Sequence, residues 1–266
     1  MENVVFSESW KAYFEKSGFK VFNDFFKYDK GLVVNKNSRR DVTRFELTDG
    51  GEKKAFFMKR FYRPHIKDMI FSFLSFGKSC SQGQLEFNNA SLLLKKNIET
   101  YRPVCFGQRV NLGIESQSFF ITEEIDGVCF TEWLAENYDK MDDAQKEAVM
   151  VSMAEFVRRI HKAKISMPDL YVWHLYMLNP IDLDNLKWAV IDLHRMSLHV
   201  KDADKKIRNL GSLDYSMLDK YFSAEMKKAF IKAYVKNDGL FADVKITEKM
   251  QDRSAQICKR RNKKEY

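Results

Sequence analysis

The chain has 266 residues, enough for one large domain or two small ones with a sizeable core. Its 45% hydrophobic and 31% charged residues, with 4 prolines and 11 glycines, exclude a disordered or fibrous protein. The formal net charge of +8 indicates an anionic partner, which can be a nucleotide, a phospholipid surface or a nucleic acid.

The first eight residues contain acids and neither a basic region nor a long apolar run, so we expect no signal peptide. No stretch of about eighteen apolar residues is present, so nothing is expected to span a bilayer. The four cysteines form no C-x-x-C pair, which argues against structural zinc and favours reduced thiols. The expected location is therefore cytoplasmic.

Residues 31–59 are predicted to be rich in β-strands. Apolar and polar residues alternate in Val42–Leu47, and Lys54–Lys59 is a second candidate strand. Between them, Asp49-Gly50-Gly51 is typical of a hairpin turn. A helix is then predicted from about Gln84 to Lys95.

A short buried strand is predicted at Ser118–Glu123, and the pattern breaks at Glu124–Gly127. We place the boundary between two lobes there. The first lobe is residues 1–124, rich in β-strands and nucleotide-binding, and the second is residues 125–266, helical and catalytic.

The second lobe is predicted to be mainly helical. A long helix starts at Asp142 or Asp143, either of which can cap it, and ends near Ala163. A hairpin follows, with strands at 175–178 and 186–191, and the stretch 205–249 is helical with breaks. A β-rich lobe with one main helix, followed by a helical lobe, is an α+β arrangement with the layout of a bilobal protein-kinase-like fold.

Two carboxylates in this second lobe have the placement that phosphoryl transfer needs. Asp169 lies in a loop after the long helix, and Asp192 ends an apolar strand. In kinase-type chemistry one acid orients the acceptor hydroxyl and the other holds the metal. The alternatives are a turn aspartate after Pro168, and an Asp192 carboxylate paired with Arg195.

Lys59 and Glu86 are candidates for nucleotide binding. Lys59 ends an apolar strand, from which an ammonium can reach the α- and β-phosphates. Glu86, on the following helix, is the candidate carboxylate that would hold it. The alternative is a surface lysine at a strand end.

His174, five residues after Asp169, occupies the position where kinases place a metal-binding asparagine. Oxygen ligands suit Mg²⁺ better than imidazole does. His174 is therefore expected to orient Asp192 or to touch a phosphate rather than to ligate the metal directly; the alternative is a satisfied core histidine. No glycine-rich loop is present, and residues 35–40, with Lys36, Arg39 and Arg40, stand in its place as phosphate contacts or as a solvated turn.

Together these residues resemble the lipopolysaccharide core kinases, the heptose and Kdo kinase (WaaP-like) family. The resemblance runs from about Ala55 to Tyr234. It is carried by Phe57–Lys59, Glu86–Phe87, Phe119–Glu124, Ile160–His161, Asp169–Tyr171 with His174, Ile191–Arg195 and Arg208–Ser216.

The resemblance implies ATP and Mg²⁺ as cofactors. It also implies phosphorylation of a heptose or Kdo hydroxyl on the lipopolysaccharide inner core, at the cytoplasmic face of the inner membrane. The implied roles are Lys59 on the phosphates, Glu86 holding Lys59, Asp169 as base, Asp192 and His174 at the metal, and the backbone from Glu123 to Ile125 at adenine.

One departure from the family is visible, because Met167 and Pro168 stand where the family usually has His-Arg. A catalytically impaired kinase-like scaffold therefore stays open, as does a kinase for another hydroxyl on a protein or small molecule. Nucleic-acid binding ranks last, since no recognition motif supports it.

An anionic membrane surface is a further expected partner. Residues 69–76 are strongly apolar, and Arg60, Arg63, Lys67 and Lys78 flank them. The basic tail at 259–264 would add attraction. The alternative is that the phenylalanines pack between the lobes and that the tail is solvated.

Overall fold

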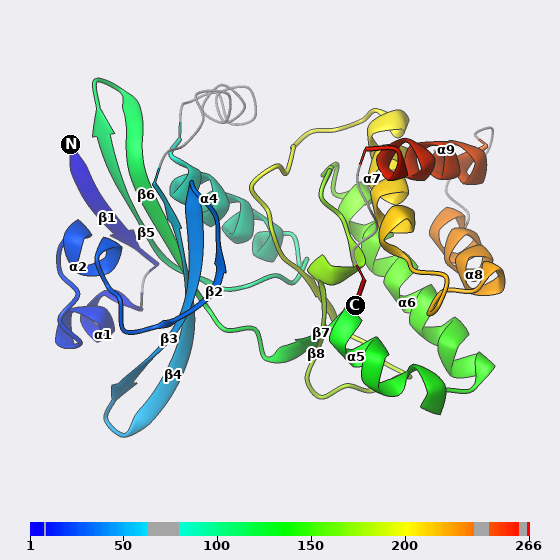
Figure 1. Ribbon diagram of the computed structural model, residues 1–266, viewed down its shortest axis with the longest axis horizontal. Helices are drawn as coiled ribbons and strands as arrows, with labels where there is room; N and C mark the ends of the chain where they lie inside the picture. The colour runs from blue at the N-terminus through cyan, green and yellow to red at the C-terminus, as the bar shows by residue number, and fades with distance from the viewer. Residues whose placement is uncertain (8, 63–79, 237–244, 261–264) are drawn as a thin grey trace. The chain divides into compact units, whose positions relative to one another are not determined.

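The computed structural model describes residues 1–7, 9–62, 80–236, 245–260 and 265–266. The chain divides into two compact units (Figure 1). The N-terminal unit comprises Met1–Lys95 and Tyr101–Ile125, and the C-terminal unit comprises Lys96–Thr100 and Asp126–Tyr266.

A six-stranded antiparallel sheet forms the centre of the N-terminal unit, in the order β1-β5-β6-β4-β3-β2. The predicted hairpin is confirmed as β3 and β4, where Asp49 pairs with Glu52 across Gly50 and Gly51. Both glycines have positive φ, +60° and +87°, which a tight hairpin turn requires. The strands are β1 (Glu2–Phe6), β2 (Leu32–Lys36), β3 (Arg40–Asp49), β4 (Glu52–Phe61), β5 (Pro103–Asn111) and β6 (Ile114–Glu123).

Helices cover both faces of this sheet (Figure 1). The predicted helix is confirmed as α4 (Gln82–Lys95), which packs on β5 and β6. The short helices α1 (Lys11–Lys16) and α2 (Phe22–Phe26) lie on the opposite face, where they contribute to a phenylalanine-rich core. That core includes Phe14, Phe19, Phe22, Phe25, Phe26, Phe45, Phe56 and Phe119.

Helices dominate the described part of the C-terminal unit. The predicted long helix is confirmed as α6 (Asp143–Lys162), and Asp142 caps it by accepting from the Gln145 N–H at 2.8 Å. The predicted hairpin is confirmed as β8 (Leu175–Leu178) and β9 (Trp188–Val190), with β7 (Gly127–Cys129) added beside β8. The other helices are α5 (Phe130–Asn137), α7 (Ala203–Ser216), α8 (Ala224–Val235) and α9 (Ile246–Cys258).

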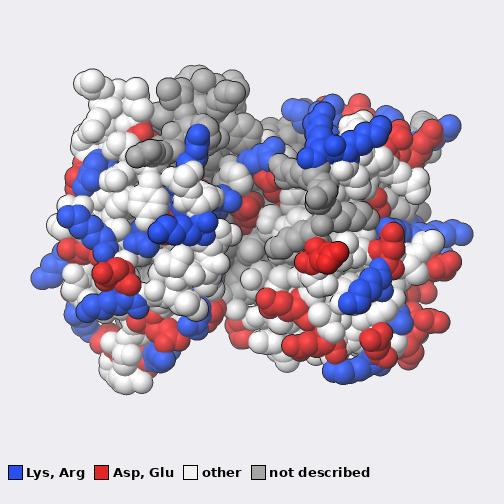
Figure 2. Space-filling model, in the orientation of Figure 1, with Lys and Arg blue, Asp and Glu red and all other residues white. Residues whose placement is uncertain are grey.

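The observed elements confirm the predicted α+β class, with a β-rich N-terminal part and a helical C-terminal part. Acidic and basic side chains are both spread over the visible face of each unit (Figure 2). Anion binding is therefore better argued from particular residues than from the net charge of +8.

Candidate functional site

Lys59 and Glu86 form an ion pair in the N-terminal unit. Lys59 lies on β4, and its Nζ is 2.6 Å from Oε1 of Glu86 on α4. The Glu86 side chain is 1% exposed, so leaving its charge unpaired would be costly. The Tyr101 hydroxyl donates to the other carboxylate oxygen at 3.1 Å. Two partners thus fix the carboxylate that holds the Lys59 ammonium.

The turn between β2 and β3 is closed by a side chain. Oδ1 of Asn37 accepts from the backbone N–H groups of Arg39 and Arg40, at 2.9 and 3.0 Å. These two N–H groups therefore point into the turn, while the side chains of Lys36 and Arg39 are exposed. An anion at this turn would meet side-chain charge instead of a backbone cradle.

The segment from Glu123 to Ile125 ends the N-terminal unit. The Glu123 N–H donates to the Arg102 carbonyl and the Glu124 N–H to the Ala55 carbonyl, both at 3.0 Å. Within the described residues the Ile125 N–H has no hydrogen-bond partner, so it is the donor available to a ligand. Burial raises the pKa of the Glu123 carboxyl above its ordinary value.

Asp169 lies in the loop between α6 and β8 of the C-terminal unit. Its backbone carbonyl accepts from Nδ1 of His174 at 2.8 Å, and its Oδ1 accepts from Nη1 of Arg195 at 2.9 Å. Arg195 thus pairs with Asp169, so the alternative that placed it on Asp192 is wrong. Oδ2 of Asp169 is buried and has no hydrogen-bond partner among the described residues. One oxygen of this carboxylate is therefore available to accept a proton.

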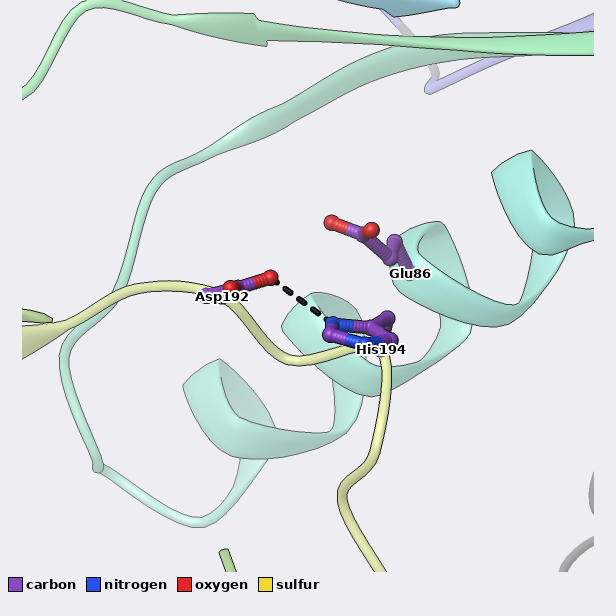
Figure 3. Close-up of side chains that lie close together, drawn as sticks. All are labelled: Glu86, Asp192 and His194. Atoms are coloured by element: carbon purple, nitrogen blue, oxygen red, sulfur yellow. Dashed lines mark hydrogen bonds and ion pairs between the residues drawn. The ribbon is translucent and has the colours of Figure 1, made fainter. Parts of the chain in front are cut away.

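Asp192 follows β9 in the left-handed region, with φ +62°. A residue other than glycine adopts this conformation at a cost, and such outliers concentrate at functional sites. Its Oδ1 accepts from Nδ1 of His194 at 2.8 Å (Figure 3). Its Oδ2 is 3.8 Å from Nε2 of His174. The structure thus brings Asp169, His174 and Asp192 together in one unit.

The His174 ring fits a cation beside Asp192. A carbonyl oxygen only accepts, so Nδ1 of His174, bonded to the Asp169 carbonyl, carries the hydrogen. In the neutral ring Nε2 is then an acceptor that faces the Asp192 carboxylate. Two acceptors that face each other favour a positive charge near them, and carboxylate oxygen is the ligand type that Mg²⁺ prefers.

Asn209 on α7 forms a hydrogen bond with the start of the Asp169 loop. Oδ1 of Asn209 accepts from the Met167 N–H at 2.8 Å and from Nε2 of His161 at 3.2 Å. The hydroxyl of Tyr234 donates to Nδ1 of the same ring at 2.6 Å. This buried network anchors the loop although Met167 and Pro168 replace the expected His-Arg.

The buried ring of His161 is expected to make stability depend on pH. Burial lowers its pKa to about 3, from 6.5 for an exposed histidine, and nearby Lys206 acts in the same direction. Below pH 6.5 the His161 ring is protonated in the unfolded chain but stays neutral in the folded protein. The free energy of unfolding therefore falls as the pH falls toward 3. This group alone should remove about 2 kcal/mol between pH 7 and pH 5.

Urea unfolding at pH 7 and pH 5 measures this effect. His161→Gln should be less stable at pH 7, but it should lose about 2 kcal/mol less than the parent between the two values. An equal loss in parent and variant would show that His161 does not titrate in this way.

A second support holds the far end of the loop. The side-chain oxygen of Ser216, at the end of α7, accepts from the Val172 N–H at 2.9 Å. The hydroxyl of Tyr266 donates to the Ser216 carbonyl at 2.7 Å, and its ring stacks on Tyr221. Residues near the end of the sequence therefore help to fix the loop that carries Asp169.

Sequence reasoning missed several of these partners. His194 and Asn209 lie inside segments that carry the family resemblance, so their polar side chains could have been chosen as candidates from the sequence. Tyr101 and Tyr266 had no such signal, since each contacts a residue distant in the chain.

The expected membrane segment, residues 69–76, lies outside the described residues, as do Arg63, Lys67, Lys78 and tail residues 261–264. Arg60, expected to flank a lipid surface, is instead buried, so that expectation is wrong. Its guanidinium donates to Oδ1 of Asp41 at 2.8 Å and to the Tyr28 carbonyl at 2.7 Å. In the described ranges, no helix combines the length and hydrophobicity needed to cross a bilayer.

The sequence is similar to known kinases of bacterial lipopolysaccharide. Two relatives are each named lipopolysaccharide core heptose(I) kinase WaaP. The protein from Escherichia coli (strain K12) is 27% identical over 175 residues, 64% of this chain and 64% of the relative. The protein from Pseudomonas aeruginosa (strain PAO1) is 28% identical over 149 residues, 53% of this chain and 55% of the relative. The chain thus spans less than two thirds of the length of these relatives.

The fold also matches a solved structure, described as WaaP in complex with acyl carrier protein. The TM-score is 0.72 at 20% sequence identity, over 96% of this chain and 99% of that one. This likeness shows a common fold. A profile of the Lipopolysaccharide kinase (Kdo/WaaP) family matches residues 24–234, and these contain every candidate site residue. The chain therefore belongs to the Lipopolysaccharide kinase (Kdo/WaaP) family.

Proposed function

We propose that this protein is an ATP-dependent kinase that phosphorylates a heptose or Kdo hydroxyl of the lipopolysaccharide inner core. Family membership and the names of the two relatives support this function. The observation that carries it is the Asp169 carboxylate, with one oxygen held by Arg195 and the other buried without a partner among the described residues.

Asp169 acts as the base. The acceptor hydroxyl oxygen forms a bond to the γ-phosphorus of ATP, and the bond from that phosphorus to the β–γ bridging oxygen breaks. ADP leaves with the electron pair of the broken bond, and the hydroxyl proton passes to Oδ2 of Asp169. The hydrogen bond from His174 to the Asp169 carbonyl keeps the loop in position for this transfer.

The N-terminal unit binds the nucleotide. Lys59 contacts the α- and β-phosphates, and Glu86 fixes its ammonium. The Ile125 N–H donates to adenine, and the Glu123 carbonyl accepts from it. The exposed side chains of Lys36 and Arg39 meet the phosphates by charge.

The C-terminal unit is catalytic and holds the metal. Asp192 supplies oxygen to Mg²⁺, and Nε2 of His174 either ligates it or orients Asp192. When bound, Mg²⁺ neutralises charge on the phosphates. His194 keeps the Asp192 carboxylate in place through its hydrogen bond.

The protein acts at the cytoplasmic face of the inner membrane, as a peripheral protein on an anionic surface. A lipid-linked acceptor has to be met at the bilayer, where anionic lipid attracts basic side chains near the surface. Sedimentation with anionic vesicles that weakens as salt rises would support this location. Failure to sediment even at low salt would contradict it.

Incubation with γ-labelled ATP and a series of core lipopolysaccharides of defined truncation tests the proposed function. We expect label on those acceptors that retain the target sugar, and none with Asp192→Asn. Label on protein or on a small molecule would favour a kinase for another hydroxyl. Nucleotide binding without transfer to any acceptor would indicate a scaffold.

The His174→Asn variant is expected to retain more activity than His174→Ala. The asparagine amide offers Mg²⁺ an oxygen and also carries N–H donors for the Asp169 carbonyl, whereas alanine offers neither. Turnover measured across a Mg²⁺ titration checks this. Equal loss in both variants would mean that asparagine cannot replace the function of this ring.

A further inference from the structure

Arg195 places an incompletely bonded cation beside the proposed base. Its side chain is 53% exposed, and Nη1 is 2.9 Å from Oδ1 of Asp169. A guanidinium carries five N–H donors in a planar fork. In the described part of the chain, Asp169 is the only hydrogen-bonding or ion-pair partner of this side chain. Most of its donors are therefore available to a ligand.

The backbone around Arg195 is anchored to the stretch that leads into the Asp169 loop. Ser166 and Ser197 form an antiparallel bridge, with N–H···O distances of 3.0 and 2.9 Å. The Val200 N–H donates to the Lys164 carbonyl at 2.9 Å. Both residues of the ion pair are thus attached to one framework, and the hydrogen bond to Asp169 holds the guanidinium beside the carboxylate.

The chain that follows Arg195 carries several exposed basic side chains. Asp202 caps α7 by accepting from the Asp204 N–H at 2.8 Å, and Asp204 pairs with Lys249 at 3.0 Å. Three exposed basic side chains have no ion-pair partner in the described ranges: Lys201, Lys205 and Arg208.

We propose that Arg195 binds an oxyanion of the acceptor, a carboxylate or a phosphate, beside the hydroxyl that receives phosphate. This inference rests on the proposed function and makes Arg195 a residue that determines acceptor specificity. One edge of the guanidinium stays on Asp169 while another takes the oxyanion, as the planar fork allows. Without this cation, the Asp169 carboxylate would repel an anionic acceptor.

Kinetics of Arg195→Gln with three forms of one core acceptor test the proposal: intact, carboxyl-reduced and phosphatase-treated. For the intact acceptor we expect KM to rise about 10- to 100-fold, the range for one charge-assisted hydrogen bond. For the form that lacks the recognised oxyanion, the KM of the parent should already be high and Arg195→Gln should change it little. The form that behaves in this way identifies the oxyanion as carboxylate or phosphate.

Two further variants keep the test interpretable. Arg195→Lys preserves the charge without the fork, so its KM for the intact acceptor should lie between parent and Arg195→Gln. Lys232→Gln removes an exposed charge from α8 of the same unit and should leave every KM unchanged. Calorimetric titration of the intact acceptor, without ATP, should show the same weakening for Arg195→Gln.

A fall in kcat that is equal for all three acceptors, with unchanged acceptor binding, would overturn the proposal, because Arg195 would then only position Asp169. Equal rises in KM for all three forms would overturn it as well. If the parent enzyme phosphorylates none of these acceptors, the proposed function itself fails. That result is distinct from a change in KM that Arg195→Gln causes equally with and without the oxyanion.

Discussion

Replacing Asp169 by asparagine is expected to lower the turnover number about 10²- to 10⁴-fold, the usual effect of losing a general base. The amide has nearly the shape of the carboxylate, and its oxygen can still accept from Nη1 of Arg195. It cannot take the hydroxyl proton, however. ATP affinity should survive, because Lys59 and Glu86 lie in the other unit.

Steady-state kinetics with the core acceptor and nucleotide titration measure these two effects. Asp139→Asn is a suitable control, because it makes the same chemical change at an exposed carboxylate. If Asp169→Asn transfers phosphate at the parent rate, another group is the base.

Removing Lys59 or Glu86 is expected to destabilise the protein as well as to inactivate it. Lys59→Ala leaves a carboxylate that is 1% exposed with the Tyr101 hydroxyl but without its cation. Breaking a buried ion pair in this way typically costs about 3–5 kcal/mol. Since the two residues act as one unit, Lys59→Ala with Glu86→Ala should lose little more activity than the worse single variant.

Unfolding free energies and kcat/KM values around this double-mutant cycle give the coupling. The pair Lys16 and Asp49, 3.4 Å apart and exposed, is a control in the same unit that lies outside the proposed nucleotide site. Its cycle should show a coupling of about 0–1 kcal/mol. Additive losses at Lys59 and Glu86 would show that their ion pair does not matter for activity.

Elements with a strong local signal could be predicted from the sequence. The β3–β4 hairpin has alternating residues and two turn glycines, and α6 has Asp142 and Gln145 at capping-box spacing. The helices α1 and α2, with 6 and 5 residues, are too short for a 3.6-residue period to be visible. They are held by the phenylalanine core, so tertiary contacts decide their structure.

In the candidate site, too, some features have a local sequence signal and others depend on contacts between distant residues. Residue type and position along the chain are enough to single out Lys59, Asp169 and Asp192. Partners were harder to predict, because Arg195 is as compatible by sequence with Asp192 as with Asp169. The backbone bridge between Ser166 and Ser197 settles that choice, and no local pattern encodes it.

The most direct measurement for the kinase function is transfer of label from γ-labelled ATP to a purified inner-core lipopolysaccharide. Alkaline hydrolysis and chromatography then identify the labelled sugar. The expected result is a phosphate ester on a heptose or Kdo hydroxyl, formed by the parent protein and reduced at least about 10²-fold by Asp169→Asn. Label that appears only as free phosphate, or transfer that is equal in parent and variant, would contradict the account.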